Sequence, residues 1–194
     1  MIYPLKIQQL RAAPNQLTLL RLCIIPFIVL AVFDQSYRVA FGLFILAGLT
    51  DGLDGLLARA LKQRTALGQY LDPMADKLLL STLFLVLYHE GLISMRVTVL
   101  VFARDLGIVI VAAILYVSIG MKDFRPSLFG KANTLAQITA LLTVLLSMFY
   151  DPQLVRMVRY WSLLATVVFT VVSGFHYAWQ VTRRFSTAPA TAGD

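Results

Sequence analysis

Four aspartates lie close together in the first half of the chain, at spacings that suit a shared chemical task. Asp51 and Asp54 are three residues apart and Asp72 and Asp76 are four apart, in the segment DGLDGLLARALKQRTALGQYLDPMADK. Each spacing places the two members of a pair on one face of a helix. Four of the ten acidic residues fall within residues 51–76. Carboxylates suit hard divalent cations such as Mg²⁺, and two such ions can clamp a phosphoryl group.

The residues between the two aspartate pairs fit a ligand that carries phosphate. Gly55 and Ala58 continue the face of the first pair with little side chain, which leaves room for a ligand against the helix. Arg59 returns to the same face and has the forked donor geometry that binds phosphate. Gly68, one turn before the second pair, opens the same space on the facing helix. The segment contains no histidine or cysteine, which argues against a zinc site.

The composition predicts that these residues are positioned by helices in a membrane. The chain has 194 residues, of which 59% are hydrophobic and 14% charged. A spanning helix needs about 20 residues, so six of them would use about 120 positions. This excludes a water-soluble globular protein and a disordered one, and the single cysteine, Cys23, excludes a disulfide-built one. We expect an all-α integral membrane protein whose residues 1–194 form one domain.

Six apolar segments are the expected spans, and the second, third and fourth carry unusual polar residues. The expected spans are residues 17–33, 39–60, 69–88, 92–120, 132–150 and 160–182. A short basic loop joins the second and third, so these two helices should be antiparallel and the two aspartate pairs should face each other. Residues 1–13 are expected to form an interfacial amphipathic helix, and residues 185–194 a flexible tail.

The positive charge predicts the orientation in the membrane. The chain has 17 Lys and Arg against ten Asp and Glu, a net charge of +7. Counted by side, ten basic residues fall on one side of the membrane and four on the other. This places both termini, the loop between the second and third spans and the loop between the fourth and fifth spans in the cytoplasm. The excess is also suited to anionic membrane lipids. No long basic patch interleaved with aromatic residues is present, so nucleic acid is not an expected partner.

Three basic residues near or within the spans are candidates for binding a second, phosphate-bearing substrate. Charge inside a membrane is by default a functional hypothesis. The candidates are Arg21, Arg104 and Lys131. The alternatives left open are a salt bridge within the helix bundle for Arg104, which precedes Asp105, and an interfacial anchor for Lys131.

The complete pattern from Asp51 to Asp76, D-x-x-D-G-x-x-A-R, eight residues, then G-x-x-x-D-x-x-x-D, resembles the signature of the CDP-alcohol phosphotransferase family, also called CDP-alcohol phosphatidyltransferases. The similarity extends over about residues 14–180 and includes the opening P-N-x-L-T-x-x-R, which ends at Arg21. The resemblance implies a six-helix fold, usually homodimeric, with its active site at the cytoplasmic membrane boundary. In a bacterium this would be the inner membrane.

The resemblance also implies a reaction and a set of residue roles. Family members transfer a phosphatidyl or related group from CDP-diacylglycerol or another CDP-linked alcohol to an acceptor hydroxyl, and release CMP. The four aspartates would hold two Mg²⁺ or Mn²⁺ ions, and Asp76 would also be the general base on the acceptor hydroxyl. A turn at residues 14–17 would close over the CDP group. The residues expected to contact or shape the CDP site are Pro14, Asn15, Gln16, Leu17, Gly55, Ala58, Arg59, Thr65 and Gly68.

The acceptor is less well determined by the sequence. The stretch G-K-x-N-T-x-x-Q, which contains Lys131 and Asn133, is similar both to members that use glycerol 3-phosphate and to members that use phosphatidylglycerol. Many of the former carry lysine where this chain has Asn133. We expect glycerol 3-phosphate as the commoner acceptor, with phosphatidylglycerol as the alternative. A divalent-cation transporter is a distant alternative, because the last two expected spans offer few polar residues to line a path.

Overall fold

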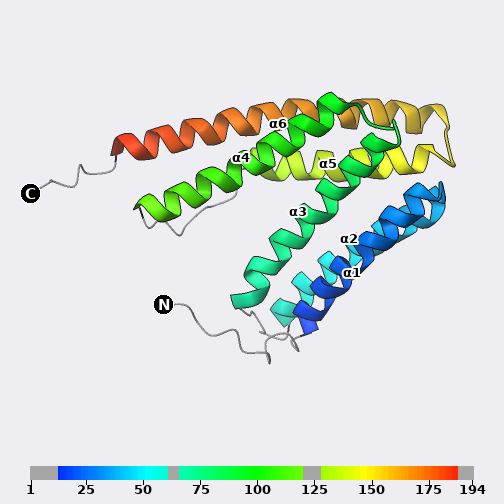
Figure 1. Cartoon of the computed structure of the whole chain (residues 1–194), viewed down its shortest axis with the longest axis horizontal. Coiled ribbons are helices and arrows are strands. Elements are labelled where there is room, and N and C mark those ends of the chain that lie inside the picture. The colour runs from blue at the N-terminus through cyan, green and yellow to red at the C-terminus, as the bar shows by residue number, and fades with distance from the viewer. Residues whose placement is uncertain (1–12, 61–65, 120–127, 188–194) are drawn as a thin grey trace, which may run out of the picture. The chain divides into compact units, whose positions relative to one another are not determined.

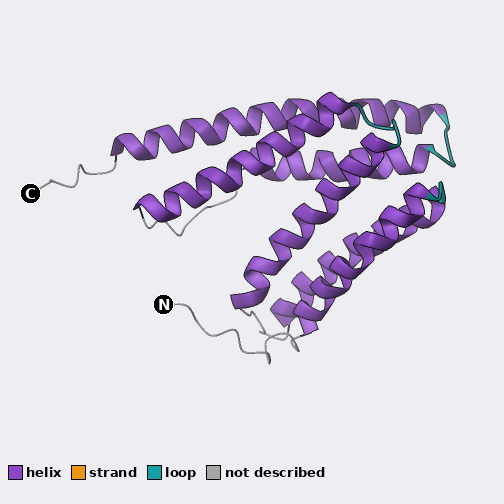
Figure 2. Cartoon of the chain, viewed as in Figure 1, coloured by secondary structure: helices purple, strands orange, loops and turns teal. Residues whose placement is uncertain are grey.

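The computed structural model describes residues 13–60, 66–119 and 128–187, without the side chains of residues 13–14, 54–60, 66–70, 112–119, 178 and 180–187. The described part of the chain is helical, with short turns and no strand (Figure 2). Six helices follow one another along it (Figure 1). They are α1 (Ala13–Phe33), α2 (Tyr37–Ala60), α3 (Ala66–His89), α4 (Met95–Ile119), α5 (Leu128–Ser147) and α6 (Gln153–Thr187).

Each helix coincides with one of the apolar segments, so the all-helical prediction is confirmed. Three of the described helices contain a stretch long and apolar enough to cross a membrane, namely Asn15–Phe33, Leu128–Ser147 and Gln153–Tyr177. The other three are the helices in which the sequence places most of the intramembrane charge. That all six cross the membrane stays a prediction.

Two helix boundaries differ from the expectation. Residues 14–17 do not form a separate turn, because α1 already begins at Ala13. Proline is tolerated in the first turn of a helix, where its missing N–H has no partner to lose, so Pro14 does not delay the start. At the other end α6 continues to Thr187, so the first three residues of the expected tail are helical. The expected interfacial helix falls almost entirely on residues outside the described ranges.

The chain divides into two compact units, each described by itself below. The first comprises Met1–Ile93 and Leu141–Met157, and the second Ser94–Ala140 and Val158–Asp194. In the first unit α1 packs against α2 and α3. The second contains α4, the first part of α5 and most of α6.

The buried face of α1 changes character along its length. Its second half buries Ile24, Ile28 and Val32, which are at most 6% exposed and recur at the spacing of one helical face. The same face continues toward the N-terminus with a polar set, which is Asn15, Thr18 and Arg21. Apolar burial therefore anchors one half of the helix, and the other half needs polar partners.

Two tight turns end helices of the first unit. After α1, the Ser36 N–H donates to the Ala31 carbonyl at 2.8 Å, and Gln35 has a φ of 55°. After α3, the Leu92 N–H donates to the Leu87 carbonyl at 2.8 Å, and Gly91 has a φ of 73°. A left-handed residue with this hydrogen bond ends a helix sharply. The short turn after α1 makes α1 and α2 consecutive antiparallel neighbours.

The second unit buries more polar groups than the sequence led us to expect. The expectation that the last two helices carry few polar residues is wrong. On α5 and α6 the buried polar side chains are Asn133, Gln137, Ser162, Thr166, Thr170 and Ser173. The spacing of three and four residues on α6 places its hydroxyls on one face, where most donate to carbonyls of their own helix. A hydrophobicity count overlooks them because such hydroxyls fit an apolar helix at little cost.

Candidate active site

A buried arginine on α1 joins two of the four predicted metal-binding aspartates. Arg21 has a fully buried side chain, and its Nη1 lies 2.9 Å from Oδ1 of Asp51 on α2. The same Nη1 donates to Oδ1 of Asp76 on α3. Two carboxylates from different helices therefore converge on one nitrogen. Their side chains remain 48% and 41% exposed, so the open side of the pair is accessible to a ligand.

A third predicted ligand is held one turn earlier on α1. The buried hydroxyl of Thr18 donates to Oδ1 of Asp72 at 2.5 Å. Because Thr18 and Arg21 are three residues apart, they point from the same face of α1. The polar half of this face thus contacts Asp51, Asp72 and Asp76, and the predicted convergence of the second and third helices is confirmed for Asp51 and Asp76, which share one partner atom. We call this group, with Thr18 and Arg21, the carboxylate centre.

The carboxylate centre has the donor chemistry of a hard divalent cation. Carboxylate oxygens are the ligands preferred by Mg²⁺ and Mn²⁺, and two of them already converge on a single positive group. Among the described residues, no three acidic, histidine or cysteine side chains approach closely enough to be grouped as a metal site. The predicted fourth ligand, Asp54, has a side chain outside this description.

Most of the predicted CDP-binding side chains also lie outside the description. Gly55, Ala58 and Arg59 are within α2 and Gly68 is within α3, in segments for which only the helix is described. Thr65 falls in the undescribed segment between them. Their roles therefore stay predictions.

The first turn of α1 presents its predicted CDP-binding residues in different directions. Asn15 is 1% exposed and belongs to the buried polar face. Gln16 is exposed and Leu17 is half-buried. Of this set, Asn15 shares the helix face of Thr18 and Arg21. For Pro14 only its place within the helix is described.

The second predicted basic residue, Arg104, lies in the other unit and has an acidic partner of its own. Its Nη1 is 2.7 Å from Oδ1 of Asp105, and each of these side chains is only 10% exposed. Its Nε donates to Oγ of Ser173 at 3.0 Å, which links α4 to α6. This is the salt bridge within the bundle that the sequence left open, and it places Arg104 at a fixed position between two helices.

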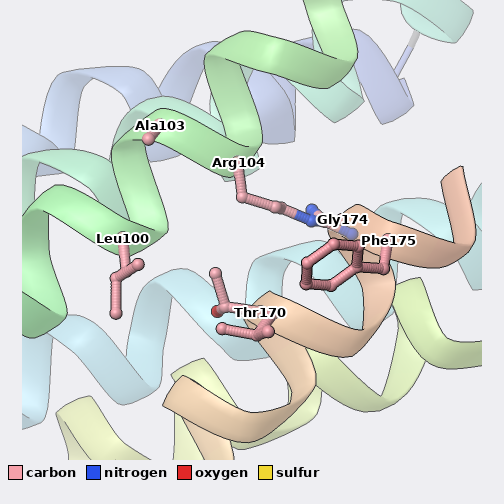
Figure 3. A pocket seen from close by; sticks show the side chains of 7 residues that line it. Leu100, Ala103, Arg104, Thr170, Gly174 and Phe175 are labelled. Carbon is pink, nitrogen blue, oxygen red and sulfur yellow. The ribbon is translucent and has the colours of Figure 1, made fainter. Parts of the chain in front are cut away.

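A cavity of about 340 Å³ adjoins Arg104 (Figure 3). Arg104 extends from α4 toward Gly174 and Phe175 on α6 in this view. The lining residues are Leu100, Ala103, Arg104, Thr170, Val171, Gly174 and Phe175. Arg104 is the only charged member of this set, so an anionic group in the cavity would meet one guanidinium among mostly apolar side chains.

Lys131, the third candidate for binding the acceptor substrate, and the nearby Asn133 differ in burial. Lys131 is exposed on α5, as an interfacial anchor or a substrate ligand would both require. Asn133 is fully buried, and its Oδ1 accepts a hydrogen bond from Oγ1 of Thr170 at 2.9 Å. Because Thr170 also lines the cavity, Asn133 lies directly behind its wall.

Comparison with known proteins decides the family. A model of the family described as CDP-alcohol phosphatidyltransferase matches residues 11–172. The chain belongs to this family. The matched residues include all four aspartates and the whole of α1. The resemblance seen in the sequence is thereby confirmed, and membership of a transferase family favours an enzyme over the transporter alternative.

Some relatives are named for the synthesis of phosphatidylglycerophosphate and others for the synthesis of cardiolipin. A CDP-diacylglycerol--glycerol-3-phosphate 3-phosphatidyltransferase of Bacillus subtilis is 34% identical over 180 residues, covering 84% of this chain and 92% of the relative. A probable phosphatidylglycerophosphate synthase of Mycobacterium tuberculosis is 31% identical over 185 residues, covering 92% and 85%. Human cardiolipin synthase (CMP-forming) is 41% identical over 105 residues, which is 54% of this chain and 34% of the human protein. The chain thus matches about a third of the length of the human protein.

The sequence reasoning did not foresee what Thr18 and Arg21 do. Thr18 was given no role, and Arg21 was assigned to the acceptor, whereas both contact predicted metal ligands. The available signal was the spacing of α1, where positions 15, 18 and 21 share the face that becomes apolar at Ile24. A polar run on a face that is otherwise buried requires polar partners, and the aspartates of the next two helices are nearby candidates.

Proposed function

We propose that this protein transfers a phosphatidyl group from CDP-diacylglycerol to a hydroxyl of glycerol 3-phosphate, giving phosphatidylglycerophosphate and CMP. The observation that carries the proposal is the convergence of Asp51 and Asp76, from separate helices, on one buried guanidinium. Full-length relatives from Bacillus subtilis and Aquifex aeolicus are named for this reaction. Their identity of 32–34%, with 92% of each relative covered, supports a shared reaction.

The reaction needs charge compensation more than covalent help from the protein. In the transfer, a bond forms between the acceptor oxygen and the phosphorus, and the bond to the CMP oxygen breaks. Two Mg²⁺ or Mn²⁺ ions, held by Asp51, Asp54, Asp72 and Asp76, would neutralise the diphosphate and the charge on the departing oxygen. Positioning supplies much of the remaining acceleration.

Asp76 has the proposed role of general base. It would accept the proton of the acceptor hydroxyl late in a loose transition state, when that oxygen is already bonding to phosphorus. Its side chain is 41% exposed and is oriented by Arg21, so its open side can face a substrate hydroxyl. Arg59 and Thr65 are proposed to bind the CDP group, with Gly55, Ala58 and Gly68 leaving space for it.

The wider setting follows from the same proposal. Both termini and the carboxylate centre would face the cytoplasm, in a bacterial inner membrane, with six spans and a homodimeric assembly. The lipid tails of CDP-diacylglycerol would stay in the bilayer while its headgroup reaches the carboxylate centre. The acceptor would be bound through Arg104 and Lys131.

A second candidate acceptor is phosphatidylglycerol, which would make the product cardiolipin. It is favoured by Asn133, whose neutral side chain is fully buried and hydrogen-bonded to Thr170. A lysine at this position would supply a positive charge suited to the phosphate monoester of glycerol 3-phosphate. The 41% identity to human cardiolipin synthase, over a match of 105 residues, points the same way. The two acceptors share a glycerol hydroxyl as the attacking group, so the carboxylate centre would work identically on either.

One assay tests the proposal and separates the acceptors. Purified protein in detergent would be mixed with CDP-diacylglycerol, Mg²⁺ or Mn²⁺ and one acceptor at a time, and CMP release followed. We expect CMP release with glycerol 3-phosphate and phosphatidylglycerophosphate as the product. Release with phosphatidylglycerol alone would move the assignment to cardiolipin synthesis. No release with either acceptor would overturn the proposed function.

A further inference from the structure

Arg21 contacts two carboxylates of the carboxylate centre that a cation would also need as ligands. Its Nη1 contacts Oδ1 of both Asp51 and Asp76, and these oxygens are among the proposed cation ligands. An oxygen that accepts a hydrogen bond from a guanidinium has less capacity to coordinate a cation at the same time. The guanidinium and a divalent cation therefore draw on the same donor atoms.

The burial of Arg21 makes this overlap strong. The side chain is 0% exposed, so water does not screen its charge as it screens that of a surface arginine. A fixed positive charge within a few ångströms of a cation site repels the cation. The two aspartates are half-exposed, so a cation can approach them from the side opposite Arg21 without entering the core.

The same contact holds the helices together. Two carboxylates from α2 and α3 would repel each other if nothing positive lay between them, and the guanidinium supplies that charge from α1. Arg21 therefore stabilises the packing of the three helices and, at the same time, weakens cation binding.

From this geometry we infer that Arg21 is a built-in competitor of the divalent cation, which sets the cation affinity of the carboxylate centre below what its aspartates would give alone. The inference rests on the proposed function only in taking these aspartates as cation ligands. Arg21 is a positioning residue here, because it acts on the carboxylates rather than on a substrate.

The test is the binding of Mn²⁺, followed by the loss of the free-ion signal in electron paramagnetic resonance. Arg21→Gln should bind Mn²⁺ about tenfold more tightly than the wild type, since one buried positive charge is removed. Arg156→Gln is the matched control, because Arg156 is an exposed arginine of the same unit, paired with Asp151. It should bind Mn²⁺ within about twofold of the wild type. Unchanged or weaker binding by folded Arg21→Gln would overturn the inference. The predicted gain in affinity cannot come from structural damage, because damage lowers affinity.

A second measurement serves if Arg21→Gln does not fold. In the wild type, the ¹⁵Nε resonance of Arg21, assigned by its loss in Arg21→Lys, should shift on titration with diamagnetic Mg²⁺. A resonance that stays in place while Mg²⁺ binds would contradict the competition.

The outcomes separate this inference from the proposed function. Wild-type protein that releases CMP, with no gain of Mn²⁺ affinity in Arg21→Gln, would refute the inference alone. Tighter Mn²⁺ binding by Arg21→Gln, with no CMP released by the wild type for either acceptor, would refute the proposed reaction alone.

Discussion

Arg21 on α1 is fully buried, Arg104 on α4 has 10% of its side chain exposed, and the two arginines are neutralised in different ways. Arg21 contacts two aspartates that come from two other helices, 30 and 55 residues away in sequence. Arg104 contacts Asp105, its immediate neighbour. The first group has one more negative charge than positive, and Asp72 adds another beside it. The second group is balanced.

The difference teaches what each region is suited to bind. An excess of carboxylate charge at half-exposed side chains attracts a cation, and it persists only because a buried guanidinium offsets part of it. A balanced pair has no such surplus, and the cavity beside Arg104 is lined mostly by apolar side chains. This difference supports the proposal that the cation binds and the reaction takes place at the carboxylate centre, and that the acceptor is bound in the region of Arg104.

The largest expected effect comes from neutralising one acid of the carboxylate centre. Asp76→Asn should lower the rate of CMP release by about 1,000-fold, because it removes both the proposed base and a cation ligand. Asp151→Asn, which changes an exposed acid paired with Arg156, should keep the wild-type rate. An Asp76→Asn protein with more than about a tenth of the wild-type rate would remove Asp76 as the base.

A smaller and different effect is expected at the balanced pair. Arg104→Gln should raise the KM for the acceptor about tenfold with little change in kcat, since an interaction with the bound acceptor is lost without altering the reacting groups. Arg96→Gln, at an exposed position on the same helix, provides the control. An unchanged KM in a folded Arg104→Gln protein would leave Arg104 with a structural role, through its contacts with Asp105 and Ser173.

The smallest effect should come from the hydroxyl that orients Asp72. Thr18→Val removes the hydrogen bond from the Thr18 hydroxyl to Asp72 and should lower the free energy of unfolding by about 1 kcal/mol. Thr139→Val is a suitable comparison, because the Thr139 hydroxyl donates to the Leu135 carbonyl of its own helix at 2.9 Å. Denaturation of both variants would measure the loss in free energy of unfolding for each. Equal losses would mean that the hydrogen bond from Thr18 to Asp72 stabilises the fold no more than the one from Thr139 to Leu135.

The sequence predicted the helices well because apolar length is a local property. Each expected span falls on an observed helix, and the pairing of Asp51 with Asp72 and Asp76 across two helices follows from their short connection. The role of Arg21 could not be found in this way. A basic residue in an apolar helix has many possible partners, and only the packing of α1 against α2 and α3 selects Asp51 and Asp76.

The second unit was harder to predict for a related reason. Serine and threonine in an apolar helix satisfy their hydroxyls on the preceding turn, so the buried hydroxyl face of α6 leaves little trace in hydropathy. The hydrogen bond between Thr170 and Asn133 joins residues 37 apart in sequence, and no local pattern specifies it. The same holds for Arg104 and Ser173, 69 residues apart.

The most direct test of the central assignment is Mn²⁺ binding by the wild type, Asp76→Asn and Asp105→Asn, measured by electron paramagnetic resonance in detergent. Each variant removes one carboxylate that is paired with a buried arginine, one in each region. The assignment predicts that the wild type and Asp105→Asn bind Mn²⁺ with similar affinity, while Asp76→Asn binds at least about tenfold more weakly. Loss of binding in Asp105→Asn, with binding retained in Asp76→Asn, would contradict it.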